Sequence, residues 1–587
     1  MCGIGGIMTA NGTTPAANVL DRLIAALSHR GPDGSRRYAR DNVGLIHARL
    51  AIIDLKTGTQ PLMGPTGCAL VANAEIYNYV ELKQQLPGAK FATASDCEPI
   101  LFHYDKYGAD CTRELRGMYA FGLHDPATRT LLVSRDPFGI KQVYYVESPA
   151  GFAFASEPQA LIAAGLCDAI LEKQPAGELL QLQFTTGPST IFRGIRRVLP
   201  GETLVVKDGR VVERRFKAGL PDTGPIEIGE REALDRLDKL LLETVAVHER
   251  SDVPVGLFLS GGIDSASILS CMVQLHGKSV QAYTASFPNT SVQDEYPDAH
   301  QVATGAGVRH IKVDVTARDF FALLPKMAAA MDDPTADYAL VPTYLLAREA
   351  AKDNLRVVLS GEGGDEMFAG YSRYRRQIRP WWLGGRQRRR TGPFSKTDVL
   401  RDRSAAWRAG IVAAEKAAAL PGRSRLQTAQ AADFVDYLPH GLLVKLDRCL
   451  MAHGVEGRTP LLDIELAKFA FRLPQELKLR NRRGKYLLRQ WLAKHMPEAN
   501  SLGRKRGFTT PVADWIATEG ARLAPLVAAD PAVAEIAVPE KAKALFTSGQ
   551  KQHREAAWRL LFYALWHRRH IRGRAPEGDV FECLASP

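Results

Sequence analysis

The sequence predicts an α+β domain followed by an α/β domain that contains a parallel sheet and ends in helices. Three observations carry this prediction. Short β-type runs broken by Gly and Pro fill roughly the first 215 residues, strands and helices alternate from about residue 230, and the chain looks mostly helical beyond Gly370. A chain of 587 residues is long enough to form several cores.

Composition excludes several classes of protein. The chain is 45% hydrophobic and 24% charged, values typical of globular proteins, which excludes a disordered chain, a collagen-like repeat and a coiled-coil rod. Lys plus Arg number 76 against 64 Asp plus Glu, for a formal charge of +12. This mild excess permits an anionic ligand such as a nucleotide and leaves nucleic acid open.

The first region reads as strands with two helices between them. Helices are expected at 18–27 and 98–107, with Ser95 or Asp96 as a possible N-cap of the second. The strand runs are 43–46, 69–72, 131–134, 143–146 and 203–206.

A change in composition and periodicity marks a linker. Residues 217–229 (KAGLPDTGPIEIG) hold two Pro and three Gly without periodicity. Beyond them we expect an amphipathic helix over 230–247, a buried strand leading into the SGG turn, strands at 280–287 and 356–359, and helices at 342–351, 405–420 and 461–471. The predicted division is 2–216, linker 217–229, 230–572, and a frayed tail at 573–587.

Cysteine usage and hydropathy point to a cytoplasmic protein. Eight cysteines include no CxxC pair and no Cys/His cluster with zinc spacing, so most are expected to be buried apolar fillers in a reducing compartment. No apolar run approaches the roughly 18 residues of a membrane span. The N-terminus MCGIGGIM lacks the basic region of a signal peptide, and no membrane partner is expected.

Cys2 follows the initiator Met. Removal of Met1 would leave a free α-amine on the residue that carries the thiol, so one residue would supply both nucleophile and base. Position alone favours a cysteine with no role, and the motifs downstream reverse that balance.

Six separated motifs accompany Cys2: residues 29–33 (HRGPD), 47–54 (HARLAIID), 60–61 (QP), 73–78 (NAEIYN), 95–98 (SDCE) and 135–141 (RDPFGIK). With Cys2, the set resembles the N-terminal-nucleophile glutaminase domain of class II glutamine amidotransferases over residues 2 to about 205. The resemblance implies an αββα sandwich that hydrolyses glutamine.

The chemistry of glutamine binding fits these residues. The substrate's carboxylate needs a cation, which Arg49 supplies, and its ammonium needs an acceptor, which Asp96 supplies. The resemblance implies that Asn73 and the backbone N–H of Ala74 stabilise the oxyanion. It also implies that Leu50, Ile53 and Glu75 line the glutamine site.

Ala74 departs from the family pattern, which usually reads Asn-Gly-Glu here. The backbone N–H survives the change, but a positive φ would not suit Ala. Either the position is extended or the oxyanion hole is slightly reshaped, and the rate of glutamine hydrolysis depends on which holds.

A second constellation begins at a strand-to-helix junction. Small residues there let backbone N–H groups face an anion at a helix N-terminus, and no GKS or GKT follows, so this is not a Walker A loop. It matches the SGGxDS loop of ATP pyrophosphatases, with Asp264 as a natural Mg²⁺ ligand. The residues are Phe258, Leu259, Ser260, Gly261, Gly262, Asp264 and Ser265.

Later pieces extend this site. Ser286 and Phe287 end a strand where an adenine or ribose would lie. Residues 360–366 (SGEGGDE) follow another strand, with Ser360 and Gly361 expected to contact ATP. The simplest interpretation of Asp332 and Asp333 is that they are turn and cap residues.

Residues from about 230 to 520 resemble the synthetase domain of the asparagine synthetase B family. The resemblance implies that Glu362 serves in forming and attacking an aspartyl adenylate, that Lys485 neutralises charge on the transferring phosphoryl group, and that Asp264 and Asp365 hold Mg²⁺ on pyrophosphate. Arg448, Arg458 and Asp463 are equally well explained as structural ion pairs.

Together the halves predict an ATP-dependent, glutamine-hydrolysing ligase that makes asparagine from aspartate, with an internal ammonia tunnel implied by the resemblance. Glutamine, aspartate and ATP are the expected substrates, and a homodimer is one option for its assembly. Ligation to another carboxylate acceptor in envelope or natural-product biosynthesis stays open, because the glutamine and ATP motifs would be identical.

Two further alternatives are weaker. An RNA-modifying enzyme would use a similar loop, with the basic stretch Arg386–Arg390 beside Trp381 and Trp382 as its contact, but it would leave the glutaminase motifs unexplained. A solvated surface loop is the simpler interpretation of that stretch. A degenerate homologue is disfavoured because every motif residue that the chemistry requires is present.

Overall fold

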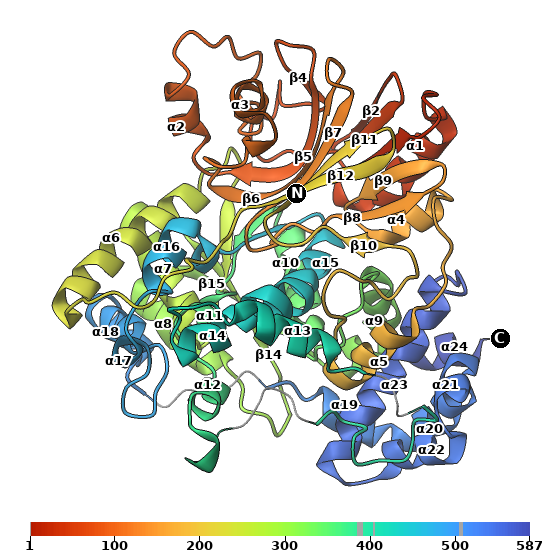
Figure 1. Ribbon diagram of the computed structural model, residues 1–587. Helices are drawn as coiled ribbons and strands as arrows, with labels where there is room; N and C mark the ends of the chain where they lie inside the picture. Colours follow the sequence, from red (N-terminus) through yellow and green to blue (C-terminus); the bar gives the residue numbers. More distant parts are fainter. Residues whose placement is uncertain (1, 384, 386–390, 403–405, 504–508, 587) are drawn as a thin grey trace.

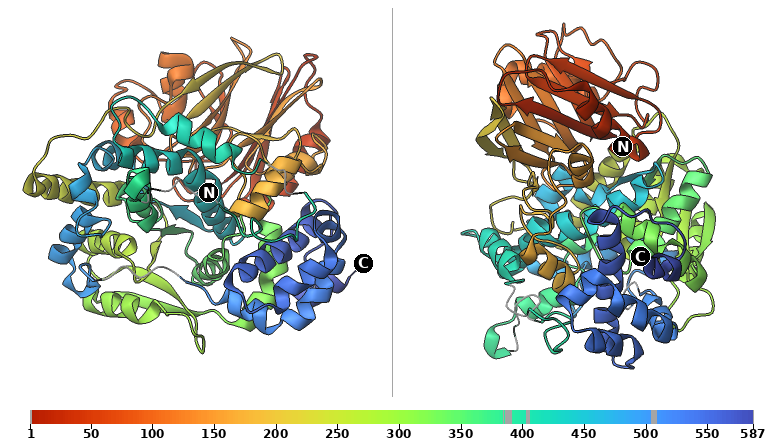
Figure 2. Two further views of the ribbon diagram at one scale, coloured as in Figure 1. Left: turned by 60° about the horizontal axis from the view of Figure 1, so that its bottom comes forward. Right: turned by 90° about the vertical axis from the view of Figure 1, so that its right-hand side faces the viewer.

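The computed structural model describes residues 2–383, 385, 391–402, 406–503 and 509–586. An N-terminal half of antiparallel sheets lies against a C-terminal half built on a parallel sheet (Figures 1 and 2). The basic stretch Arg386–Arg390 lies outside the described residues.

The N-terminal half contains two six-stranded antiparallel sheets, ordered β10-β8-β9-β1-β3-β2 and β12-β11-β7-β6-β5-β4. All five predicted strand runs fall in these sheets. The strands are β1 (Gly3–Thr9), β2 (Ser35–Arg40), β3 (Val43–Ala48), β4 (Leu62–Met63), β5 (Ala69–Ile76), β6 (Gly117–Asp125), β7 (Thr130–Arg135), β8 (Tyr144–Ser148), β9 (Gly151–Ala155), β10 (Arg196–Arg197), β11 (Glu202–Lys207) and β12 (Arg210–Phe216).

Apolar side chains from both sheets interleave to form a core, with Ile4 and Val43 from one sheet against Val71 and Leu131 from the other. Helices α1 (Ala17–Leu27) and α4 (Pro158–Ala163) cover the outer face of the first sheet. Helices α2 (Tyr79–Gln84) and α3 (Pro99–Tyr107) cover the second. The layers are therefore αββα, which confirms the predicted sandwich. Short 3₁₀ turns η1 (Ser28–Arg30) and η2 (Gly108–Asp110) follow α1 and α3.

Helix α5 (Lys173–Leu182) belongs to the N-terminal half by sequence, but it extends away from the sandwich. It packs beside α23 (Lys551–His570) of the C-terminal half (Figure 1). Residues 217–229 then cross between the halves without helix or strand.

The C-terminal half is built on a parallel five-stranded sheet ordered β15-β14-β13-β16-β17. This confirms the predicted parallel sheet. Its strands are β13 (Val255–Phe258), β14 (Gln281–Ser286), β15 (Arg309–Asp314), β16 (Val357–Leu359) and β17 (Glu456–Arg458).

Helices cover both faces of this sheet, as a parallel sheet requires. On one face pack α6 (Glu230–His248), α7 (Ile263–His276), α8 (Tyr296–Ala306) and α18 (Tyr486–His495). On the other lie α9 (Ala317–Ala330), α10 (Leu340–Lys352) and α15 (Leu443–Met451).

The remaining chain is mostly helical, as predicted. Its elements are α11 (Gly364–Met367), α12 (Ser372–Gln377), η3 (Trp381–Leu383), α13 (Ala409–Ala418), α14 (Arg425–Ala432), the π-helix η4 (Asp433–Leu442), η5 (Pro460–Leu462), α16 (Ile464–Ala470), α17 (Gln475–Lys478), η6 (Pro497–Ala499), α19 (Val512–Thr518), α20 (Gly520–Ala529), α21 (Pro531–Ile536), α22 (Pro539–Thr547) and α24 (Val580–Ala585).

Two local predictions are wrong. Neither Ser95 nor Asp96 caps α3, whose N-cap is Glu98 with no side-chain bond; Asp96 instead accepts the backbone N–H of Ile76. The sequence predicts a frayed tail at 573–587, but its residues Val580–Ala585 form the capped helix α24. Arg568 fixes α24 by donating to the carbonyls of Cys583 and Leu584.

The eight cysteines are free thiols, and six of them are buried. No helix within the described part of the chain is long and apolar enough to cross a membrane.

Candidate functional site

Cys2 lies at the start of β1 and faces β5. Its backbone N–H donates to Asn73 Oδ1 at 3.0 Å, and its Sγ lies 3.8 Å from the Leu50 carbonyl oxygen. Burial raises the pKa of the Cys2 thiol above its ordinary value. Asn73 is fully buried: its oxygen accepts from Cys2, and its amide Nδ2 has no partner among the described residues.

Arg49 follows β3, the strand that pairs with β1. Gly3 pairs with Ala48 in the β1–β3 ladder, and Cys2 and Arg49 are the next residues beyond this pair. The Arg49 guanidinium donates to the Asp54 carbonyl at 2.5 Å and to Thr59 Oγ1 at 3.3 Å, which fixes its direction.

Asp96, which precedes α3 in the sequence, lies beside the last residue of β5, and its Oδ2 accepts from Ile76 N at 2.8 Å. Burial raises the pKa of Asp96 to about 6. Its carboxyl group therefore changes charge within the range in which enzymes are assayed. The side chains of Leu50 and Ile53 belong to an apolar cluster with Val357 and Met451 at the contact between the halves.

Ala74 adopts an extended conformation within β5, opposite Tyr119 of β6. Its φ is not among the positive values found in the chain. Of the two possibilities that the sequence left open at this position, the structure shows the extended one.

Glu75 has a partner that sequence reasoning did not assign. Its Oε2 lies 2.9 Å from Nη2 of Arg458, which follows Glu456 on strand β17 of the C-terminal half. Arg458 also pairs with Glu456 at 2.6 Å, and its own carbonyl accepts the N–H of Ser360 at 2.8 Å. The EGR run 456–458 was visible in the sequence, but nothing in it indicated a partner almost 400 residues away.

A second buried connection joins the halves through Arg30. Its guanidinium forms two hydrogen bonds to Asp447 of α15, at 2.8 and 3.0 Å, and its Nε donates to the Cys2 carbonyl at 3.2 Å. Arg448, next to Asp447, pairs with Asp332 at 2.7 Å. Arg448 therefore forms a structural ion pair.

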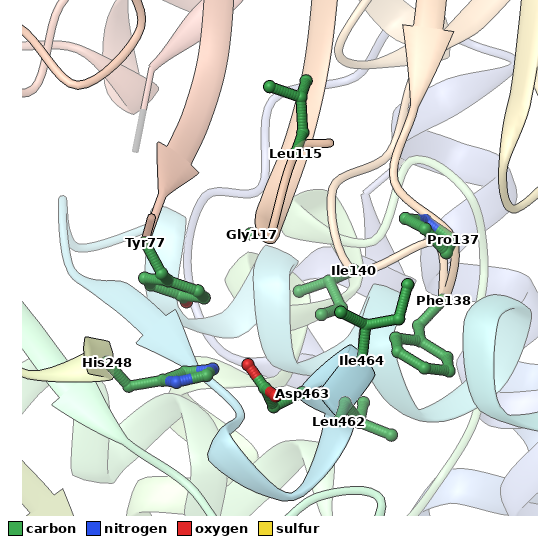
Figure 3. Close-up of a pocket in the computed structure, with 10 residues that line it drawn as sticks. All are labelled: Tyr77, Leu115, Gly117, Pro137, Phe138, Ile140, His248, Leu462, Asp463 and Ile464. Carbon is green, nitrogen blue, oxygen red and sulfur yellow. The ribbon is translucent and has the colours of Figure 1, made fainter. Parts of the chain in front are cut away.

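A small cavity of about 10 Å³ lies between the halves, room for about one water molecule (Figure 3). The rings of Tyr77 and His248 flank it with centroids 3.9 Å apart. Asp463 also lines the cavity, and it pairs with Arg116 at 2.8 Å. None of the candidate catalytic residues lines this cavity.

The predicted ATP-binding residues lie at the carboxyl ends of adjacent parallel strands. Phe258 ends β13 and Leu259 follows it, Ser286 ends β14 before Phe287, and Ser360 and Gly361 follow β16. The loop after β13 is closed by Ser265 Oγ, which accepts from Ser260 N at 3.0 Å. Gly261 and Gly262 bring this loop to the N-terminus of α7. The geometry is that of an anion-binding turn at a helix N-terminus.

Lys485 brings two distant carboxylates together. Its Nζ contacts Asp264 of α7 and lies 2.5 Å from Asp365 Oδ1 of α11. Burial opposes a charged lysine, but the two carboxylates outweigh it and raise the pKa of Lys485 to about 12. Lys485 has the left-handed φ of 60°, and Gly370 lies so close that a Cβ there would meet Lys485 Cε at 2.2 Å.

Glu362 completes the group on the same edge of the sheet. Its side chain is part-buried, and burial raises its pKa above the ordinary value for a glutamate. Its Oε1 lies 3.8 Å from Nζ of Lys445, a residue of α15 that the sequence interpretation did not assign.

Family comparisons match both halves. A model of the asparagine synthase family matches residues 236–568, and one of the glutamine amidotransferase domain matches residues 1–217. The chain belongs to the asparagine synthase family. It is thus an enzyme in which a glutamine amidotransferase domain precedes an asparagine synthase domain, and the use of ATP fits the family.

Of three curated relatives, two are named asparagine synthetases, and the third is named an amidase. A putative asparagine synthetase [glutamine-hydrolyzing] of Mycobacterium tuberculosis is 33% identical, covering 94% of each chain. Asparagine synthetase [glutamine-hydrolyzing] 1 of Bacillus subtilis is 31% identical, covering 88% of each. Amidase chry2 of Gibberella zeae is 31% identical over 64% of this chain and 60% of its own.

Among solved structures, a glutamine phosphoribosylpyrophosphate amidotransferase of B. subtilis shares 18% identity at a TM-score of 0.27, covering 53% of this chain and 66% of that one.

The described residues of this chain offer few ligands for a metal. No group of three or more His, Cys, Asp or Glu side chains able to hold an ion occurs among the described residues. Asp264 and Asp365 supply two converging carboxylates, and Mg²⁺ is commonly held by one or two carboxylates together with substrate phosphates. The residues present therefore fit a magnesium ion that arrives with a nucleotide.

Proposed function

We propose that this protein makes L-asparagine from L-aspartate, taking nitrogen from glutamine and releasing glutamate, AMP and pyrophosphate. One observation carries the proposal: Arg458 pairs with Glu75 beside Cys2, while its carbonyl binds Ser360 of the ATP-side loop. One buried residue thus links a glutaminase-type site to an adenylation-type site.

In the first half-reaction Cys2 is the nucleophile. Once Met1 is removed, the α-amine of Cys2 takes the proton of the Cys2 thiol, and the sulfur attacks the side-chain amide of glutamine. Asn73 Nδ2 and Ala74 N–H donate to the oxyanion, a role supported by the unpartnered Asn73 amide. Ammonia leaves, and water hydrolyses the thioester to glutamate.

Charge complementarity holds the substrate glutamine for this attack. Arg49 binds its α-carboxylate and Asp96 its ammonium, with Glu75, Leu50 and Ile53 around them. The fixed guanidinium of Arg49 and the position of Asp96 beside the end of β5 support this assignment.

In the second half-reaction the β-carboxylate of aspartate attacks the α-phosphorus of ATP and pyrophosphate leaves. Phe258–Ser265, Ser286, Phe287, Ser360 and Gly361 bind the nucleotide, and Lys485 offsets the charge that grows on the phosphoryl group. Asp264 and Asp365 would hold Mg²⁺, which supplies charge neutralisation on the pyrophosphate when bound. Glu362 then assists ammonia as it displaces AMP from the aspartyl adenylate.

Ammonia must pass between the sites without reaching water, where it would protonate. The buried contact made by Arg30, Asp447, Glu75 and Arg458 supports an enclosed path between the halves. Free thiols and the need for ATP support a cytoplasmic site of action.

The decisive assay follows AMP and pyrophosphate release with glutamine, Mg²⁺ and ATP, with and without aspartate. We expect release to depend on aspartate and one asparagine to form per AMP. Turnover that aspartate does not stimulate would exclude this function and would return attention to another acceptor carboxylate.

A further inference from the structure

Lys445 is a buried ammonium group with fewer hydrogen bonds than its donors allow. Its side chain is 5% exposed, and its one hydrogen bond within the described residues goes to Asp337 Oδ2 at 3.1 Å. Glu362 Oε1 is farther, at 3.8 Å. A lysine ammonium carries three N–H donors, so Lys445 can donate to a further acceptor while it keeps its bond to Asp337. The arrangement points to a ligand that accepts from Lys445.

Asp337 and Glu362 flank Lys445 and are more open than it. Their side chains are 20% and 24% exposed, respectively. Asp337 Oδ1 accepts from Ala339 N at 3.1 Å, which fixes the carboxylate, and the charge of Lys445 keeps its pKa below the ordinary value despite burial. A charged pair, Asp337 with Lys445, therefore stands directly beside the proposed reacting centre at Glu362.

A turn of the N-terminal half contacts the segment that carries Asp337. Gln183 ends α5 with a left-handed φ of 78°, an uncommon conformation for a residue with a side chain. Its carbonyl accepts from Ala336 N at 2.7 Å, next to Asp337, and its Oε1 accepts from Arg559 Nη2 at 3.1 Å. The strained turn thus fixes the segment that carries Asp337.

The π-helix η4 closes the other side. Its Tyr437 packs against Phe184 of the N-terminal half, with ring centroids 5.6 Å apart, and lies near Lys445. π-helical turns are rare and frequent at functional sites. Two unusual backbone features, one from each half, therefore converge on the Asp337–Lys445 pair.

We propose that Asp337 and Lys445 recognise the charged head of the acceptor, Asp337 its α-ammonium and Lys445 its α-carboxylate. This inference rests on the proposed function and makes these two residues the determinants of acceptor specificity. An α-amino acid bound so presents its side-chain carboxylate to Glu362 and the nucleotide. Acceptors that lack either head group lose one charged partner.

Two aspartate analogues separate the two contacts. Succinate lacks the α-ammonium, and β-alanine lacks the α-carboxylate, while both keep the carboxylate to be activated. AMP formation is measured for all three acceptors with ammonia as nitrogen source, so that the Cys2 site is not involved. Asp337→Asn should lower the preference in kcat/KM for aspartate over succinate by about tenfold or more, and Lys445→Met should do the same for aspartate over β-alanine.

The controls remove equal charges elsewhere. Glu540→Gln and Lys543→Met break an exposed ion pair on α22 and should leave both preferences unchanged. Lys445→Arg keeps a cation and should retain the preference over β-alanine. Glutamine hydrolysis at Cys2 reports that each variant is folded.

The outcomes divide clearly. If the wild type uses aspartate but neither variant changes its preference, or each loses all three acceptors equally, the assignment of Asp337 and Lys445 is overturned while the proposed function stands. If the wild type shows no aspartate-dependent AMP formation, the proposed function fails, and this inference with it.

Discussion

The two candidate sites differ in how they meet solvent. Asn73, Glu75 and Asp96, around Cys2, are buried within the sandwich and against the C-terminal half. Asp264, Asp365 and Glu362 are part-exposed at the edge of the parallel sheet. A site that must retain ammonia is enclosed, whereas a site that exchanges nucleotide stays open. The difference predicts that changes in the first site affect one nitrogen source, and changes in the second affect both.

The largest separation is expected from Cys2→Ala. Without the nucleophile, glutamine-driven AMP formation should fall by about 10⁴-fold, while ammonia-driven formation stays within about twofold. Steady-state rates with each nitrogen source measure this. The control is Cys167→Ala, which should change neither rate, because this half-buried thiol contacts the carbonyls of Asp168 and Arg193. Loss of both activities in Cys2→Ala would show that the sites are not separable.

Lys485→Met should affect the open site instead. The variant loses the ammonium that contacts Asp264 and Asp365 and that would offset charge on the phosphoryl group, so AMP formation should fall by about 10²–10³-fold with either nitrogen source. Glutamine hydrolysis measured without ATP should persist. Lys494→Met removes an exposed lysine from the same helix as a control. A loss confined to the glutamine-driven reaction would contradict the assignment.

The enclosed site should also carry a pH signature. Burial raises the pKa of Asp96 to about 6, so its carboxylate is present above that pH and is lost below it. The kcat/KM for glutamine should therefore fall as pH drops through about 6, approaching tenfold per unit. The Asp96→Asn variant should have a low kcat/KM for glutamine that does not change with pH over that range. The variant Asp168→Asn, which changes an exposed residue, should show the same pH dependence as the wild type. A wild-type profile that is flat from pH 5 to 7 argues against Asp96 as the ammonium partner.

The smallest effect is expected from Ala74→Gly, which restores the residue usual in the family. Since Ala74 is extended, its N–H already points as a glycine's would, and glutaminase kcat should change by less than about twofold. The strand should lose about 0.5–1 kcal/mol of stability. Ala69→Gly, at the start of the same strand, controls for that loss. A tenfold gain in rate would show that Ala74 reshapes the oxyanion hole.

Local patterns predicted most of the fold. Short β-type runs broken by Gly and Pro predicted β3, β5, β7, β8 and β11, and a strand followed by small residues predicted the loop after β13. The predicted N-cap of α3 was wrong because the Asp96 carboxylate accepts from Ile76 N at the end of β5, a partner that is not adjacent in the sequence. The prediction of a frayed tail was wrong because helix α24 is held by Arg568, a residue outside the tail.

By itself, the sequence predicted the two fold classes, because strand runs, helix periodicity and turns are encoded locally. The resemblance of its separated motifs to a known family predicted Cys2 as the candidate nucleophile and the candidate residues for glutamine and ATP. Tertiary structure decided which distant charges meet. Arg458 with Glu75, Lys485 with Asp264 and Lys445 with Asp337 each join residues from separate elements. A buried charge requires a partner, but only the packing of sheets and helices decides which one comes within reach.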